Sequence, residues 1–69
     1  MEFLVVFERT STSVGAYVPD LPGCVAVGDS EEEAERLIEE AMAIHLAGMR
    51  EDSLPIPHPT ARTKFVEGV

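Results

Sequence analysis

One cysteine and two histidines are the side chains of this chain best suited to nucleophilic catalysis or to binding a soft metal ion. Cys24 has no basic residue beside it in the sequence, and a reactive thiolate needs positive charge nearby. His45 and His58 fall in different predicted elements, so they do not form the clustered ligands of a metal site. We therefore expect no nucleophile, metal or cofactor, and we expect Cys24 to be a small buried hydrophobic residue.

Carboxylates are the other residues that could do chemistry. A two-metal nuclease holds its ions with clustered carboxylates on central strands. In this chain residues 3–7 are all apolar, and Asp20 and Asp29 lie in predicted loops where no third partner is evident. The chain also lacks a Walker loop and a paired-cysteine motif. We therefore expect a protein that is not an enzyme.

A single small domain, residues 1–69, must position these side chains, because the length leaves no room for two domains. Short runs of apolar and β-branched residues predict strands. A capping box at Ser30 and Glu33, followed by apolar residues at helical spacing, predicts a helix that ends near Arg50 or Glu51. Alternate prolines over residues 55–59 predict an extended segment after this helix. The predicted strands span residues 3–7, 14–18, 24–27 and 61–67.

This order of elements predicts an α+β fold with two layers, β-β-β-α-β. Three strands joined by short loops form an antiparallel meander, and a right-handed crossover through the helix brings the last strand beside the first. The expected sheet is therefore four-stranded and mixed, with strand order 3-2-1-4. Its first strand is central, and the helix packs on one face.

The other face of this sheet is expected to be open and apolar. Alternate residues from Phe3 onward should face the helix, which leaves Leu4 and Val6 on the open face. A bare apolar face marks an interaction site, and a chain this short buries only about 60% of its unfolded surface. A lone cysteine cannot form an internal disulfide. We therefore expect a homo-oligomer, with Leu4, Val6 and Tyr17 at the interface.

The second half of the helix carries more apolar residues than one sheet can bury. Met42, Leu46 and Met49 have two interpretations. They either form a second contact surface for a partner or pack beneath the proline-rich segment.

The turn from Asp20 to Gly23 also has two interpretations. Pro19 and Pro22 stiffen it, so a recognition loop built this way would lose little entropy on binding. Alternatively, the residues are there for geometry, with Gly23 at positive φ and Asp20 bonded to nearby amides. A turn does not require Leu21, which we expect to fill either the edge of the core or a partner.

The chain carries 13 acidic and five basic residues, a net charge of −8. This charge argues against electrostatic binding to nucleic acid or to an anionic membrane surface. It permits a basic protein partner. The acidic helix face, which includes Glu35 and Glu39, is either a contact surface for such a partner or an ordinary solvated face.

Taken together, the order and spacing of these residues resemble the HicB-type antitoxins and the small uncharacterised proteins of the same pattern. The matching positions are Tyr17, residues 19–24, Gly28, Ser30, residues 32–34, Ala41, His45, Leu46, Ile56, Pro57 and Pro59. The resemblance implies a β-β-β-α-β domain with a partial RNase H-like fold. It also implies a dimeric or tetrameric protein that covers the active site of HicA, a small basic mRNA-cleaving toxin.

Many members of the family carry a DNA-binding domain after this unit. The chain stops soon after the last predicted strand, so we expect a single HicB-like domain without a C-terminal DNA-binding domain. No signal peptide precedes residues 3–7, and that run is too short to span a membrane, so we expect a cytoplasmic protein. The alternative function is a stand-alone homo-oligomeric domain that binds a small ligand or an unrelated protein.

Overall fold

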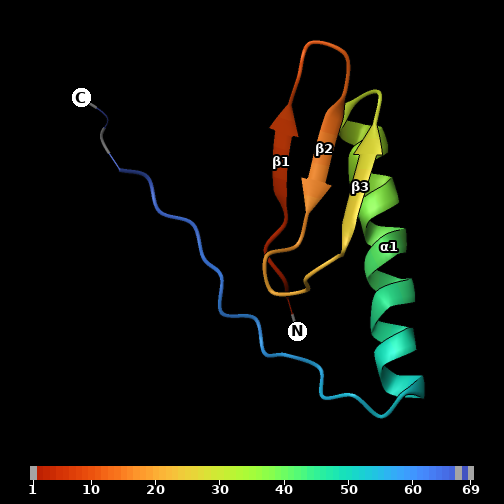
Figure 1. Ribbon diagram of the computed structural model, residues 1–69. Helices are drawn as coiled ribbons and strands as arrows, with labels where there is room; N and C mark the ends of the chain where they lie inside the picture. The colour runs from red at the N-terminus through yellow and green to blue at the C-terminus, as the bar shows by residue number, and fades with distance from the viewer. Residues whose placement is uncertain (1, 67, 69) are drawn as a thin grey trace.

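The computed structural model describes residues 2–66 and residue 68, and within them the chain folds as α+β. Three strands form an antiparallel sheet, and one long helix packs on it (Figure 1). The strands lie side by side in the order β1-β2-β3, with β2 at the centre. The elements are β1 (Val6–Arg9), β2 (Val14–Tyr17), β3 (Val25–Gly28) and α1 (Glu31–Glu51).

The strand register divides the side chains of the sheet between its two faces. Phe7 lies opposite Ala16, and Ala16 lies opposite Ala26. Because successive residues of a strand point to opposite faces, this row lies on one face and its neighbours lie on the other. Ala16 is buried beneath α1, so the row marks the helix side of the sheet.

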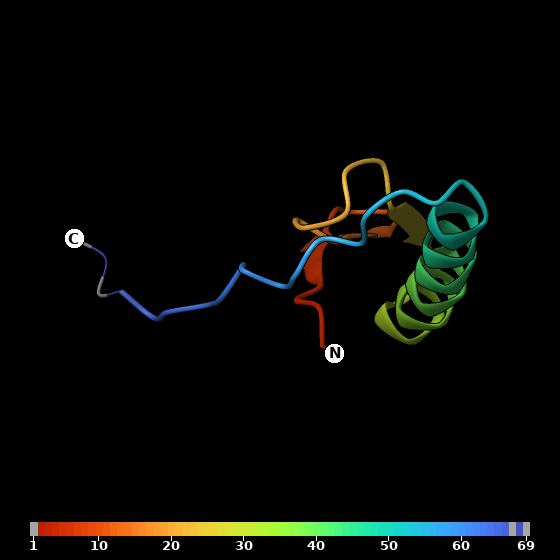
Figure 2. The same cartoon turned by 90° about the horizontal axis from the view of Figure 1, so that it is seen from below.

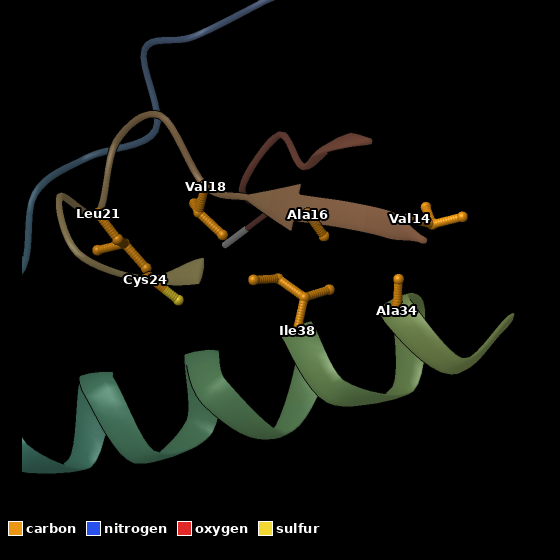
Figure 3. Close-up of a cluster of buried hydrophobic side chains, with 7 residues drawn as sticks. All are labelled: Val14, Ala16, Val18, Leu21, Cys24, Ala34 and Ile38. Carbon is orange, nitrogen blue, oxygen red and sulfur yellow. The ribbon is translucent and has the colours of Figure 1, made fainter. Parts of the chain in front are cut away.

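The core lies between α1 and the strands β2 and β3. From α1, Ala34 and Ile38 point toward β2, whose Ala16 is 2% exposed (Figure 3). Leu21, from the turn after β2, closes the end of the core and is 1% exposed. Fully burying one such aliphatic side chain is worth about 1.5–3 kcal/mol. The buried residues are Val14, Ala16, Val18, Leu21, Cys24, Ala34 and Ile38.

The start of α1 is fixed by its own sequence. The Glu33 backbone N–H donates to Ser30 Oγ at 3.1 Å, and the Glu33 carboxylate accepts from the Asp29 backbone N–H at 2.9 Å. The first bond satisfies a donor that the helix end would otherwise leave free, and the second ties Asp29, the residue before the cap, to the first turn. The predicted cap at Ser30 and the predicted end of the helix near Glu51 are therefore confirmed.

The predicted fourth strand is not observed, and the sheet has three strands rather than four. Residues 61–66 form no strand, and Glu67 lies outside the described residues. The antiparallel meander, the 3-2-1 part of the predicted order 3-2-1-4, is confirmed as β1-β2-β3, but without the fourth strand β1 is an edge strand where we expected a central one. Within β1, the apolar residue Phe7 lies on the helix side of the sheet and Val6 lies on the side away from the helix.

The first strand also begins later than predicted, at Val6 instead of Phe3. The register pairs Val6 with Tyr17, so Leu4 would have to pair with Pro19. Pro19 has no N–H for a ladder bond, and the Val18 N–H already donates to the Cys24 carbonyl at 3.1 Å. Residues 3–5 therefore have no strand partner, although Phe3, Val5 and Phe7 pack against the core as expected.

Candidate protein-binding surfaces

The sheet face opposite α1 carries a continuous exposed apolar patch. Val6, Tyr17 and Val25 lie opposite one another across the three strands, and Val27 lies in the next row beside Gly15. Val25 is 63% exposed, Val27 is 66% exposed and Tyr17 is 37% exposed. We call Val6, Tyr17, Val25 and Val27 the open face. A patch of this kind on a soluble domain marks a site for another polypeptide.

The expected interface residues fall only partly on this patch. Val6 and Tyr17 belong to it and face each other in the register. Leu4 precedes β1 and is half-buried. The sequence analysis missed Val25 and Val27, the most exposed members, although alternation with the buried Cys24 was a signal that could have found them. Glu8, which lies opposite Gly15 in the register, is a charged residue at the border of the patch.

The outer face of α1 is acidic over its first half. Glu31, Glu35 and Glu39 follow one another at four-residue spacing and are all exposed. The neighbouring Arg36 guanidinium lies 3.4 Å from the Glu40 carboxylate, and both side chains are about 60% exposed. Such a pair contributes about 0.3–0.5 kcal/mol, so it leaves the face strongly negative. We call Glu31, Glu35 and Glu39 the acidic ridge.

The apolar second half of α1 divides between the core and the surface. Met42, Leu46 and Met49 are partly buried and pack against the core. Ile44 is instead 74% exposed, four residues after the exposed Glu40. The three residues thus pack against the core itself, and whether they also lie beneath the proline-rich segment or meet a partner stays a prediction. Ile44 is an exposed apolar side chain of this half of α1.

The turn after β2 is held by backbone bonds and by a buried leucine. The Leu21 N–H donates to the Val18 carbonyl at 3.0 Å, and the Cys24 N–H donates to the Leu21 carbonyl at 3.0 Å. Gly23 has a φ of 86°, a conformation that favours glycine, as expected. Leu21 fills the edge of the core, and Pro22 and Gly23 remain exposed at the surface.

Asp20 in this turn binds the C-terminal segment. Its carboxylate accepts hydrogen bonds from the Thr60 N–H at 3.0 Å, the Thr60 hydroxyl at 2.8 Å and the Ala61 N–H at 2.9 Å. The bond from Ala61, followed by that from the Thr60 hydroxyl, lowers the pKa of Asp20 from its ordinary value of 3.8. We call this group of bonds the Asp20 clamp. It differs from the local amide bonding that the turn alone predicted.

The described residues offer little for metal or thiol chemistry. No group of three or more His, Cys, Asp or Glu side chains in them is placed to hold a metal ion. Cys24 is buried, and this burial raises the pKa of its thiol. Within the same residues no helix has both the length and the apolar character needed to span a membrane.

Comparison with known proteins gives the family. The sequence profile described as "HicB_like antitoxin of bacterial toxin-antitoxin system" matches residues 3–67, which is nearly the whole chain. The chain belongs to the HicB-like antitoxin family. The resemblance inferred from the turn, cap and proline residues is thereby confirmed.

Two curated proteins are similar to this HicB-like chain. An "Uncharacterized 14.9 kDa protein in rep-hol intergenic region" of Haemophilus phage HP1 is 35% identical over 66 residues, which cover 96% of this chain and 50% of the phage protein. A "UPF0150 protein" of Helicobacter pylori is 43% identical over 49 residues, which cover 71% of this chain and 68% of that protein. The chain thus spans about half the length of the phage relative. No solved structure matches the chain.

Proposed function

We propose that this chain is a non-catalytic binding protein of the antitoxin type, which masks a small basic mRNA-cleaving toxin of the HicA type. The observation that carries the proposal is membership of the HicB-like antitoxin family across residues 3–67. The acidic ridge supplies a physical reason for the choice of partner.

The charge of the chain suits such a partner. An enzyme that binds RNA needs basic residues around its active site to meet phosphates. The acidic ridge offers the opposite sign along two turns of α1, on a chain of net charge −8. Charge of opposite sign raises the rate of encounter and orients the partner more than it adds to final affinity. We therefore assign the ridge to the approach of the toxin.

An apolar anchor on the same helix would supply affinity. Binding energy at an interface concentrates in a few buried side chains at its centre. Ile44 is 74% exposed, one helical turn after the exposed Glu40. We therefore place the toxin contact on Glu35, Glu39 and Ile44, with a partner that wraps around α1. Pro22 and Gly23, in the turn after β2, are also exposed. A larger partner could contact them as well.

The second candidate function is self-association through the open face, which the exposure of Val25 and Val27 favours. Two chains that each carry −8 repel one another unless they meet where charge is sparse. The open face meets that condition, because none of its four residues is charged and Glu8 lies only at its border. It lies on the side of the sheet away from α1, the helix that carries the acidic ridge, so a homo-oligomer could still bind a toxin.

The experiment that tests toxin masking is growth rescue. The probe is a small basic protein encoded by a reading frame adjacent to the gene for this chain, expressed alone and then with the chain. We expect that protein to arrest growth and the chain to restore it. When Glu35→Lys and Glu39→Lys are combined, at least ten times as much of the chain should be needed to restore growth.

The matched control for this double variant is Glu2→Lys with Asp52→Lys, which changes net charge equally at exposed sites away from the ridge. Its rescue should equal that of the unchanged chain. Growth arrest that the chain does not relieve would contradict the proposal, and so would the lack of any toxic basic neighbour. Equal weakening by the two double variants would assign the effect to net charge and remove the ridge from the site.

A further inference from the structure

Residues 61–66 have the sequence of a strand but no strand partner within the chain. Thr63 and Phe65 alternate with Arg62 and Lys64, a period-2 pattern typical of a half-buried strand. Phe65 is nevertheless 103% exposed and Val66 is 78% exposed. We call residues 61–66 the tail. While Phe65 stays fully in water, the tail contributes no hydrophobic free energy to the stability of the fold.

The Asp20 clamp fixes the point at which the tail leaves the domain. Three hydrogen bonds to one carboxylate hold Thr60 and Ala61 against the turn after β2. Pro57 and Pro59, just before the clamp, restrict the backbone further. After Ala61 the chain runs outward on the side of β1 and away from the sheet, as both views show (Figures 1 and 2). The tail is therefore presented to the surroundings from a fixed base.

The edge of β1 lies on the same side of the molecule as the departing tail (Figure 1). In the described residues β1 pairs with β2 along one side, and its other side has no strand beside it. An unpaired edge exposes a row of backbone N–H and C=O groups that can bind another strand. Proteins often complete such an edge by adding an extended segment from another chain.

We propose that the tail of one copy adds as a strand to the β1 edge of a second copy, and that the two copies exchange tails reciprocally. Reciprocal exchange of the same segment closes a twofold dimer, in which each contact occurs twice. The added strand would give each sheet the fourth strand that the sequence pattern predicts. Phe65 would then be covered by the partner sheet.

Charge favours a second copy as the occupant of this edge. Arg62 and Lys64 supply two of the five basic residues of the chain. The segment that holds β1 carries Glu2, Glu8 and Arg9, all exposed, with a net charge of −1. Opposite charges on facing strands are favourable and like charges are not. The basic tail and the acidic border of β1 thus match each other within a chain that is otherwise strongly negative.

The direction of the tail separates exchange between copies from pairing within one chain. For pairing within one chain, the tail would have to bend toward its own β1 after Ala61 and run alongside it. The tail instead continues outward from the clamp, the direction in which the edge of a neighbouring copy can meet it. The exchange uses neither the acidic ridge nor any toxin, so its failure would leave the proposed function untouched.

Cross-linking between mixed chains tests the exchange. One chain carries Glu8→Cys at the β1 edge and an affinity tag, and the other carries Lys64→Cys in the tail. Both positions are exposed, and the native Cys24 is buried and so does not compete. A short bismaleimide should link tagged to untagged chain at least fivefold more than each chain to its own kind. The matched control pairs Lys64→Cys with Glu39→Cys on the outer face of α1, and should give only background.

A third chain carries both substitutions, Glu8→Cys and Lys64→Cys, and is treated at low concentration. The exchange predicts that its product is mainly a linked pair of chains. A product linked within one chain, together with no mixed product, would show that the tail folds onto its own β1 and would overturn the proposal. A lack of any tail-to-edge product, from chains whose circular dichroism matches the unchanged protein, would overturn it as well.

Discussion

Asp20 accepts two hydrogen bonds from Thr60, forty positions later in the chain, at 3.0 Å from its backbone N–H and 2.8 Å from its hydroxyl. The bonds join the turn after β2 to the segment that follows α1. A turn that the sequence left open as a recognition loop or a turn chosen for its geometry is therefore an attachment point for a distant segment. The position and direction of the tail depend on one carboxylate.

Replacing that carboxylate should release the tail without unfolding the domain. Asp20→Ala removes both acceptor oxygens, and we expect the Thr60 and Ala61 amides to exchange with solvent at least tenfold faster, while the amides of α1 stay protected. Hydrogen exchange followed by NMR measures both. Asp52→Ala, at the exposed end of α1, is the matched control and should leave the Thr60 and Ala61 amides unchanged. Protection that survives Asp20→Ala would show that the clamp does not hold the segment.

The clamp should also open in acid. Hydrogen bonds from Ala61 and Thr60 lower the pKa of Asp20 below 3.8, so the clamped state favours the charged carboxylate. Its contribution is fully present above 3.8 and is lost as the pH falls through the lower clamped value. Protection of the Thr60 and Ala61 amides should therefore persist at pH 5 and disappear only below 3.8. Asp20→Asn should abolish this pH dependence, and loss of protection in both proteins at the same pH would contradict the assignment.

Gly28 should be the glycine least tolerant of substitution among those in strands. A Cβ added at Gly28 would lie 2.7 Å from the Ala34 backbone nitrogen, where β3 ends against the start of α1. Gly28→Ala should lower the free energy of unfolding by about 1–3 kcal/mol, since backbone must shift to make room. At Gly15 the added Cβ meets nothing nearer than 3.9 Å, so Gly15→Ala should change stability by less than about 1 kcal/mol. Urea denaturation compares the two, and equal losses would refute the close approach.

The open face should govern self-association through its exposed valines. Val25→Asp places a charge where a second copy would pack, and burying an unpaired charge is strongly unfavourable. Light scattering after size exclusion should show the mass of the oligomer fall, with the fold retained. Ile44→Asp is the matched control at a similarly exposed site on α1 and should leave the mass unchanged. If the unchanged chain is a monomer at every concentration, the open face is not a contact between copies.

Local features of the fold could be predicted from sequence, and long-range ones could not. The Ser30 cap, the end of α1 and the positive φ of Gly23 each depend on residues within a few positions of one another. The fourth strand required residues 61–66 to find an edge far away in the sequence, and alternation carries no information about which edge, or which molecule, supplies it. The partner of Asp20 was hidden for the same reason.

The candidate surfaces follow the same division. The acidic ridge was visible in sequence because helical spacing places Glu35 and Glu39 on one stripe. The exposed Ile44 was not distinguished from Met42 and Leu46, because the apolar run hides where the buried stripe ends. Val6 and Tyr17 of the open face were predicted to lie at an interface, but Val25 and Val27 were missed although they alternate with Cys24, because the sequence does not show which side of β3 the helix covers.

Inhibition of RNA cleavage in a purified system tests the central claim most directly. The chain is titrated into the basic protein encoded beside its gene, and the cleavage of a labelled single-stranded RNA is followed. Masking of the toxin predicts that cleavage falls linearly with added chain and stops at an equimolar amount. Cleavage that continues unchanged in a large excess of the folded chain would show that the chain does not act as an antitoxin toward that protein.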